Sequence, residues 1–122
     1  MSSTTEARVA VITGGSSGIG LHAARALRGR GLNVYELSRR AENAEPGVTH
    51  LQADVTDEAQ VNAAVAEILR REGRIDILIN NAFVPSENVL LEDKTDAMLE
   101  RTLTSTVWAS WWAMRAALPH MR

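Results

Sequence analysis

Cysteine is absent from the 122 residues, and aromatic side chains make up only 4% of them. The lack of thiols excludes disulfides, thiolate metal sites and cysteine nucleophiles, and is typical of proteins in a reducing compartment. No stretch approaches the roughly 20 apolar residues that span a bilayer, and the first residues lack the apolar core of a signal peptide. We therefore expect a soluble cytoplasmic protein without a membrane partner.

An excess of charge of one sign is also lacking. The chain carries 13 basic and 15 acidic residues, a formal net charge of −2, so no basic surface for nucleic acid is expected. His22, His50 and His120 show no metal-ligand spacing, and we expect no metal and a surface or helix-end position for each histidine. The length allows one domain, and 45% hydrophobic residues suffice for a core.

Glycines gather where an apolar run changes into an alanine-rich helical pattern. Residues 9–12 are apolar without alternation, as in a buried parallel strand, and Gly14, Gly18 and Gly20 follow them. Glycines let the chain reverse tightly and let a diphosphate approach bare backbone, and the N–H groups of a following helix favour the anion. The pattern predicts a pyrophosphate-binding loop, with a simple tight turn as the alternative.

Strand and helix patterns alternate after a flexible tail of residues 1–7. Strands are predicted at 8–13, 32–37, 48–53 and 75–79, and helices at 19–30, 56–72 and 96–121. Pro119 predicts that the regular part of the last helix ends near Leu118. Thr56 and Thr95 are the expected N-caps of the second and third helices, and Gly73 the expected stop of the second. With right-handed crossovers, this order predicts an α/β, Rossmann-like three-layer fold over residues 8–122. Its incomplete doubly wound parallel sheet has four strands in the order 3-2-1-4, with flanking helices.

Four segments resemble the short-chain dehydrogenase/reductase family, in the expected order. They are TGGSSGIG at 13–20, Asp54-Val55, Asn80-Asn81-Ala82 and AALPHM at 116–121. The glycine spacing, Gly-x-x-x-Gly-x-Gly, differs from that of the commonest dinucleotide fingerprint. The resemblance covers nearly the whole chain, and it implies a nicotinamide dinucleotide that exchanges hydride with a carbonyl or an alcohol.

The resemblance also implies which residues contact the cofactor. In the family the loop lies near the pyrophosphate, an acid and an apolar neighbour contact the adenine, and the Asn-Asn-Ala backbone passes the ribose. The candidate set is Thr13, Gly14, Ser16, Ser17, Gly18, Ile19, Gly20, Ser38, Arg39, Asp54, Val55, Asn80, Asn81 and Ala82. An alternative role for Asp54 is to prepare the helix that starts near Thr56. Phe83, where the family usually has glycine, is expected to narrow the nicotinamide side of the cleft or to redirect the loop.

The end of the second strand indicates the preferred cofactor. An acid there would bind the ribose 2′-hydroxyl and repel a 2′-phosphate. The chain has Ser38, Arg39 and Arg40 instead, and strand alternation turns Glu36 away from the ribose. Arginine binds phosphate through paired, charge-assisted hydrogen bonds, so NADP(H) is favoured over NAD(H). The alternative is that both arginines are ordinary solvated charges.

Catalytic groups are not identifiable from the sequence. In the family a tyrosine, a lysine and a serine act on the substrate, and the Tyr-x-x-x-Lys pair would follow a further strand beyond residue 122. Neither Tyr35 nor Lys94 matches that motif, and the family's water-holding asparagine falls on Thr106. We therefore expect this chain by itself to bind cofactor with little or no turnover.

Three tryptophans, Trp108, Trp111 and Trp112, lie on the last predicted helix. Three tryptophans so close together are more than usually pack against one face of a sheet. We therefore expect the 96–121 helix and the edge of the fourth strand to contact a second copy or a complementing second half. Two other functions remain open. One is a non-catalytic nucleotide-binding module, and the other is an oligomerising interaction fragment whose glycine loop holds no ligand.

Overall fold

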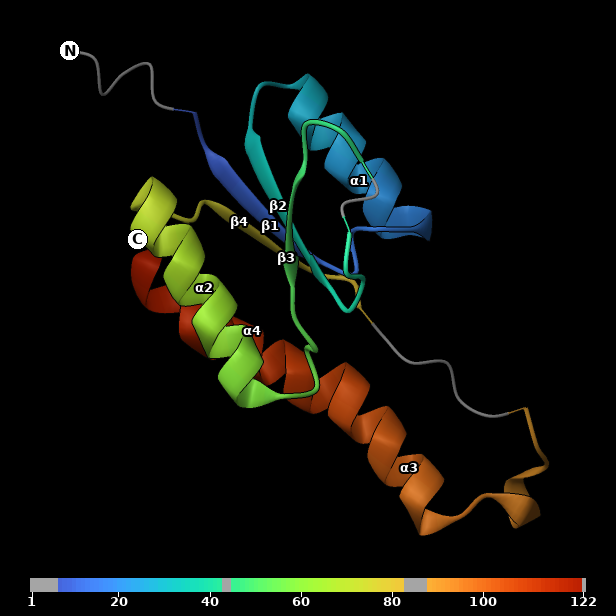
Figure 1. The fold of residues 1–122 in the computed structure, drawn as a ribbon. Helices are drawn as coiled ribbons and strands as arrows, with labels where there is room; N and C mark the ends of the chain where they lie inside the picture. Colours follow the sequence, from blue (N-terminus) through green and yellow to red (C-terminus); the bar gives the residue numbers. More distant parts are fainter. Residues whose placement is uncertain (1–6, 43–44, 83–87, 122) are drawn as a thin grey trace.

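Four parallel strands form one sheet between two layers of helices in the computed structural model, which describes residues 7–42, 45–82 and 88–121 (Figure 1). The strands are β1 (Val9–Thr13), β2 (Asn33–Ser38), β3 (Thr49–Gln52) and β4 (Ile77–Asn80). Their spatial order is β3-β2-β1-β4, which confirms the predicted fold class and order. The expectations for residues 1–6, Phe83 and the C-terminal Arg122 lie outside the described residues.

The helices divide between the two faces of the sheet. On one face lies α1 (Gly18–Gly29), and on the other α2 (Glu58–Glu72) packs beside α4 (Ala109–Ala117) (Figure 1). A further helix, α3 (Asp96–Leu103), extends past the carboxyl ends of the strands. Short 3-10 turns lie at Leu91–Asp93 and Leu118–His120. None of the helices in the described part of the chain is long and apolar enough to cross a bilayer.

The central strand β1 explains why the apolar run lacks alternation. All five of its residues are buried. Val9 and Val11 belong to the core beneath α2 and α4, whereas Ala10 and Ile12 belong to the core beneath α1. Because successive side chains of a strand point to opposite faces, the apolar run from Val9 to Ile12 supplies apolar side chains to both cores.

The ends of the helices follow local chemistry. The N-cap of α2 is Asp57, whose carboxylate accepts from the backbone N–H groups of Ala59 and Gln60, so the expectation for Thr56 was wrong by one residue. Gly73 ends α2 in the left-handed conformation, at φ 75°, as predicted. Thr95 caps α3 by accepting from the N–H of Met98 at 3.2 Å, also as predicted.

The last predicted helix is not continuous. A π-helical segment, Thr104–Trp108, separates α3 from α4, and the regular helix ends at Ala117, just before Pro119. A π segment inserts an extra residue into a helical turn, which shifts the faces of the helix on its two sides. Its side chains bond locally, with Thr104 Oγ1 donating to the Glu100 carbonyl and Ser105 Oγ to that of Thr102.

Candidate functional site

Two residues of the glycine-rich turn after β1 have backbone conformations that only glycine adopts easily. Gly14 and Gly18 have φ values of 71° and 56°, in the left-handed region that L side chains avoid. Ser17 is the N-cap of α1 and makes no side-chain bond to the helix. The first N–H groups of α1 therefore have no side-chain cap, and Ser17, Gly18 and Ile19 line a cleft.

Close packing, not conformation, explains the other glycines of the turn. A Cβ at Gly20 would lie 2.5 Å from Nδ2 of Asn81 and still closer to the Gly14 carbonyl oxygen. A Cβ at Gly15 would lie 2.6 Å from the Cβ of Glu36. Side chains at either position would push the turn away from the sheet.

Thr13 connects the turn to the segment after β4. Its hydroxyl oxygen accepts from the N–H groups of Asn81 at 3.0 Å and Ala82 at 3.1 Å, and it donates to the Ile79 carbonyl at 3.4 Å. Nδ2 of Asn81 in turn donates to the Gly14 carbonyl at 3.1 Å. Side-chain hydrogen bonds thus fix the glycine turn and the Asn-Asn-Ala segment against each other.

A cleft of about 920 Å³ opens at the carboxyl ends of the strands. In doubly wound sheets this is the edge at which ligands bind. Ten predicted residues line it: Gly14, Ser17, Gly18, Ile19, Ser38, Arg39, Asp54, Val55, Asn81 and Ala82. Four others do not. Thr13, Ser16 and Gly20 are buried, and Asn80 is exposed at the end of β4.

A wall of the cleft was missed by the sequence analysis. It comes from α3 and the π segment through Ala97, Glu100, Arg101, Thr104 and Ser105, with Leu37, Ala53 and Thr56 added from the sheet side. No local pattern marks these residues, because their place depends on how α3 approaches the strand ends. Thr106 itself is exposed and lies outside the cleft lining, whereas the neighbouring Ser105 is 1% exposed.

Asp54 performs the helix-preparing role that was one of its two predicted alternatives, and it also lines the cleft. Its Oδ1 accepts from both the N–H and the hydroxyl of Thr56. The Thr56 hydroxyl lowers the pKa of Asp54 below its usual value, and the charge of Arg39 lowers it further. Asp54 is therefore ionised at neutral pH, with Arg39 close enough to act on it electrostatically.

His50 corrects the expectation that every histidine lies at the surface or at a helix end. It lies in β3, opposite Glu36 of β2, and its side chain is only 7% exposed. Its Nδ1 pairs with the Glu36 carboxylate, and its Nε2 lies 2.6 Å from the Arg40 carbonyl oxygen. His22 and His120 are exposed, as predicted. In the part of the chain that the structure describes, no cluster of residues could hold a metal ion.

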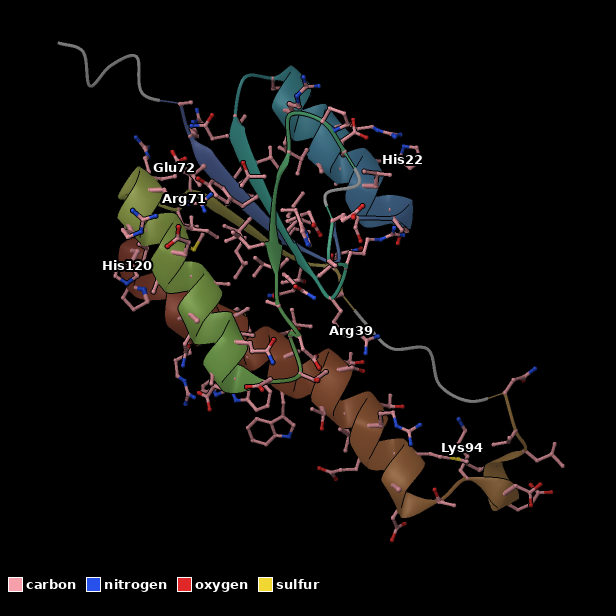
Figure 2. All side chains as sticks on the ribbon, in the orientation of Figure 1. His22, Arg39, Arg71, Glu72, Lys94 and His120 are labelled. Atoms are coloured by element: carbon pink, nitrogen blue, oxygen red, sulfur yellow. The ribbon has the colours of Figure 1, made fainter. Side chains whose placement is uncertain are left out.

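Tyr35, the only tyrosine of the chain, forms its hydrogen bond outside the cleft. Tyr35 donates to Glu72 of α2 at 2.6 Å, and burial, together with that hydrogen bond, raises its pKa to about 12. Figure 2 shows Glu72 apart from Arg39, and Lys94 on the segment that leads into α3. Neither Tyr35 nor Lys94 lines the cleft. The described lining of the cleft therefore contains no tyrosine that could exchange a proton with a substrate, as the tyrosine of the family does.

A glycine-rich turn, a helix start without a side-chain cap and a cleft at the strand ends are features typical of nucleotide-binding α/β domains. The family model "short chain dehydrogenase" matches residues 8–122. The 2-(R)-hydroxypropyl-CoM dehydrogenase of Xanthobacter autotrophicus is 36% identical, across 93% of this chain and 51% of its own length. L-fucose dehydrogenase of Bos taurus is 31% identical, across 94% of this chain and 45% of its own length.

The fold comparison agrees with the sequence comparison. The aldohexose dehydrogenase of Thermoplasma acidophilum superimposes with a TM-score of 0.88 at 28% identity, covering 95% of this chain and 45% of that one. This chain belongs to the short-chain dehydrogenase family. It spans about half the length of several curated relatives that it matches, and less of some others.

Proposed function

We propose that this chain is the NADP(H)-binding portion of a short-chain dehydrogenase/reductase that transfers hydride between nicotinamide and a carbonyl or alcohol. The observation that carries the proposal is the cleft lined by the Ser17–Ile19 backbone, at a turn that Thr13 and Asn81 hold in place. When bound, the nicotinamide supplies or accepts the hydride. The residues of this chain bind and orient the dinucleotide.

The residues present fit a dinucleotide. At Gly18 an added Cβ would meet nothing within 4 Å, so open space lies against the backbone where a phosphate would approach. Arg39 follows β2 and lines the cleft, which supports binding of a 2′-phosphate, and Val55 beside Asp54 supports an apolar contact with the adenine. The tyrosine, lysine and serine of the family's chemistry would come from a segment beyond residue 122 or from a second chain.

Replacing Arg39 with alanine is expected to lower the affinity for NADPH by about tenfold or more, because a charge-assisted bond to the 2′-phosphate is lost. The affinity for NADH should change by less than about threefold, since NADH lacks that phosphate. Calorimetric titration of both dinucleotides measures the two changes. Arg70→Ala is the matched control, because Arg70 pairs with Glu67 on the exposed face of α2. Equal losses for both dinucleotides in Arg39→Ala would argue against NADP(H) selectivity.

A partner surface formed by the π segment, α4 and the turn after α4 is the second part of the proposal. Trp108 and Trp111 are 48% and 49% exposed, and Val107 and Leu118 are exposed beside them. Among the described strands, β4 forms an edge of the sheet. A second copy, or a complementing half of the enzyme, would cover both features.

Changing Trp111 to glutamate is expected to weaken association through α4, because a charge would replace exposed apolar surface. Sedimentation velocity over a range of concentrations reports the change, with His22→Glu on the exposed face of α1 as control. A wild-type chain that stays monomeric, alone and together with the remaining half of the enzyme, would argue against this surface.

A further inference from the structure

A buried acid and a histidine lie next to the glycine-rich turn. Glu36 is 2% exposed, and the register of β2 and β3 places it opposite His50. The side chain of Glu36 packs against Gly15, where an added Cβ would lie only 2.6 Å from its own Cβ. Ser38, which lines the cleft, donates to Oε2 of Glu36 at 3.4 Å. The carboxylate is therefore one hydrogen bond away from a group that faces the proposed 2′-phosphate.

The partners of His50 decide the charge of this pair. Its Nε2 contacts the Arg40 carbonyl, and a carbonyl only accepts, so Nε2 carries a hydrogen. The contact between Nδ1 and the Glu36 carboxylate needs one further hydrogen, carried by either group. In both arrangements the pair has no net charge. Among the described residues, Oε1 of Glu36 has no hydrogen-bond partner. The contact of Oε2 with His50 is therefore the main polar contact of this carboxylate.

The same strand holds the arginine segment in place. Nε2 of Gln52 donates to the Arg39 carbonyl at 3.2 Å, and Nε2 of His50 donates to the Arg40 carbonyl at 2.6 Å. Nε of Arg40 donates to the Ser16 hydroxyl at 3.1 Å, which joins this segment to the glycine-rich turn. Two side chains of β3 thus fix the backbone from which Arg39 reaches the cleft.

We propose that His50 is a specificity-determining positioning residue: it neutralises Glu36 and holds the Arg39–Arg40 backbone, so that the site accepts a phosphorylated ribose although β2 contains an acid. An unneutralised carboxylate at this place would disfavour a second negative group nearby. The inference rests on the proposed binding of NADP(H). It adds that selectivity depends on a residue that does not itself line the cleft.

Four chains test the proposal: wild type, His50→Gln, Glu36→Gln and the double variant. His50→Gln should lower NADPH affinity by about tenfold and NADH affinity by less than about threefold, because no histidine then neutralises the negative charge of Glu36. Glu36→Gln alone should retain the NADPH preference. The double variant should return the ratio of the two affinities to within about threefold of wild type, because the charge that needs neutralising is gone.

A purely structural role predicts a different pattern. His50→Gln would then weaken both dinucleotides by the same factor, and adding Glu36→Gln would recover nothing; that result would overturn the proposal. The two failures are distinguishable. A wild-type chain that binds neither dinucleotide contradicts the proposed function and the inference with it, whereas NADPH binding with equal losses in His50→Gln contradicts the inference alone.

Nitrogen NMR of the histidine rings gives a readout that needs no cofactor. His50 should show a protonated Nε2 and a hydrogen-bonded Nδ1, and Glu36→Gln should shift the Nδ1 signal while leaving that of the exposed His22 unchanged. The His50→Gln variant assigns the signal. Ring signals of His50 that match those of His22 and do not shift in Glu36→Gln would overturn the proposal. This comparison holds even if the variants are less stable than wild type.

Discussion

Replacing Gly20 with alanine is expected to abolish measurable NADPH binding, a loss of at least about 100-fold, and to lower the free energy of unfolding by about 1–3 kcal/mol. The new Cβ would overlap the Gly14 carbonyl oxygen and approach Nδ2 of Asn81 to 2.5 Å. The first of these is a backbone atom of the turn, so it yields only if the turn moves. Calorimetric titration and denaturant unfolding measure the two effects.

Gly29→Ala is the matched control for Gly20→Ala. Gly29 lies in the same helix, at its last residue, and an added Cβ would meet nothing within 4 Å. Alanine there should leave NADPH affinity unchanged and stabilise the fold by up to about 1 kcal/mol, since glycine costs conformational entropy in a helix. If both alanine variants bound NADPH as wild type does, the glycine-rich turn would not be the dinucleotide site.

Thr13→Val is expected to lower the free energy of unfolding by about 2–4 kcal/mol, although the two side chains have nearly the same shape. The hydroxyl oxygen accepts from the N–H groups of Asn81 and Ala82, and Thr13 is 3% exposed. Valine leaves both N–H groups without that acceptor. Because these bonds also place the Asn-Asn-Ala segment at the cleft, NADPH affinity should fall together with stability.

Thr13→Ser separates the hydrogen bonds from the packing. Serine keeps the hydroxyl and removes one buried methyl group, which costs about 1 kcal/mol. Urea unfolding of both variants gives the comparison. A serine variant as unstable as the valine variant would show that the methyl group, and not the hydrogen-bonded hydroxyl, holds this part of the structure.

Much of the fold could be predicted because its signals are local. The unbroken apolar run of β1 indicated a strand buried on both faces, and Gly73 and Thr95 marked helix ends through their own backbone and side-chain chemistry. The π segment carries no such signal, since Thr104–Trp108 contains neither proline nor glycine. The cap of α2 was misplaced because Thr56 and Asp57 are both good N-caps, and Thr56 bonds to Asp54 instead.

The residues of the candidate site could be predicted where a sequence motif marks them. They could not be predicted where only the tertiary fold brings them together. The glycine-rich turn, Asp54 and the Asn-Asn-Ala segment were found from the sequence, and most of these residues line the cleft. The Glu36–His50 pair was missed, because 14 residues separate its members and only the parallel register of β2 and β3 brings them together. The wall formed by α3 depends likewise on packing between distant segments.

If the glycine-rich turn of this chain binds NADP(H), the backbone amides of the turn must respond to the cofactor. Titrating the 15N-labelled chain with NADPH, and following its backbone amide signals, measures that response. We expect saturable shifts at Ser17, Gly18 and Ile19 and at Ser38 and Arg39, with the remote C-cap residue Gly73 unchanged and with weaker binding for NADH. Absence of shifts at the turn, or shifts confined to other parts of the chain, would mean that the turn does not bind NADP(H).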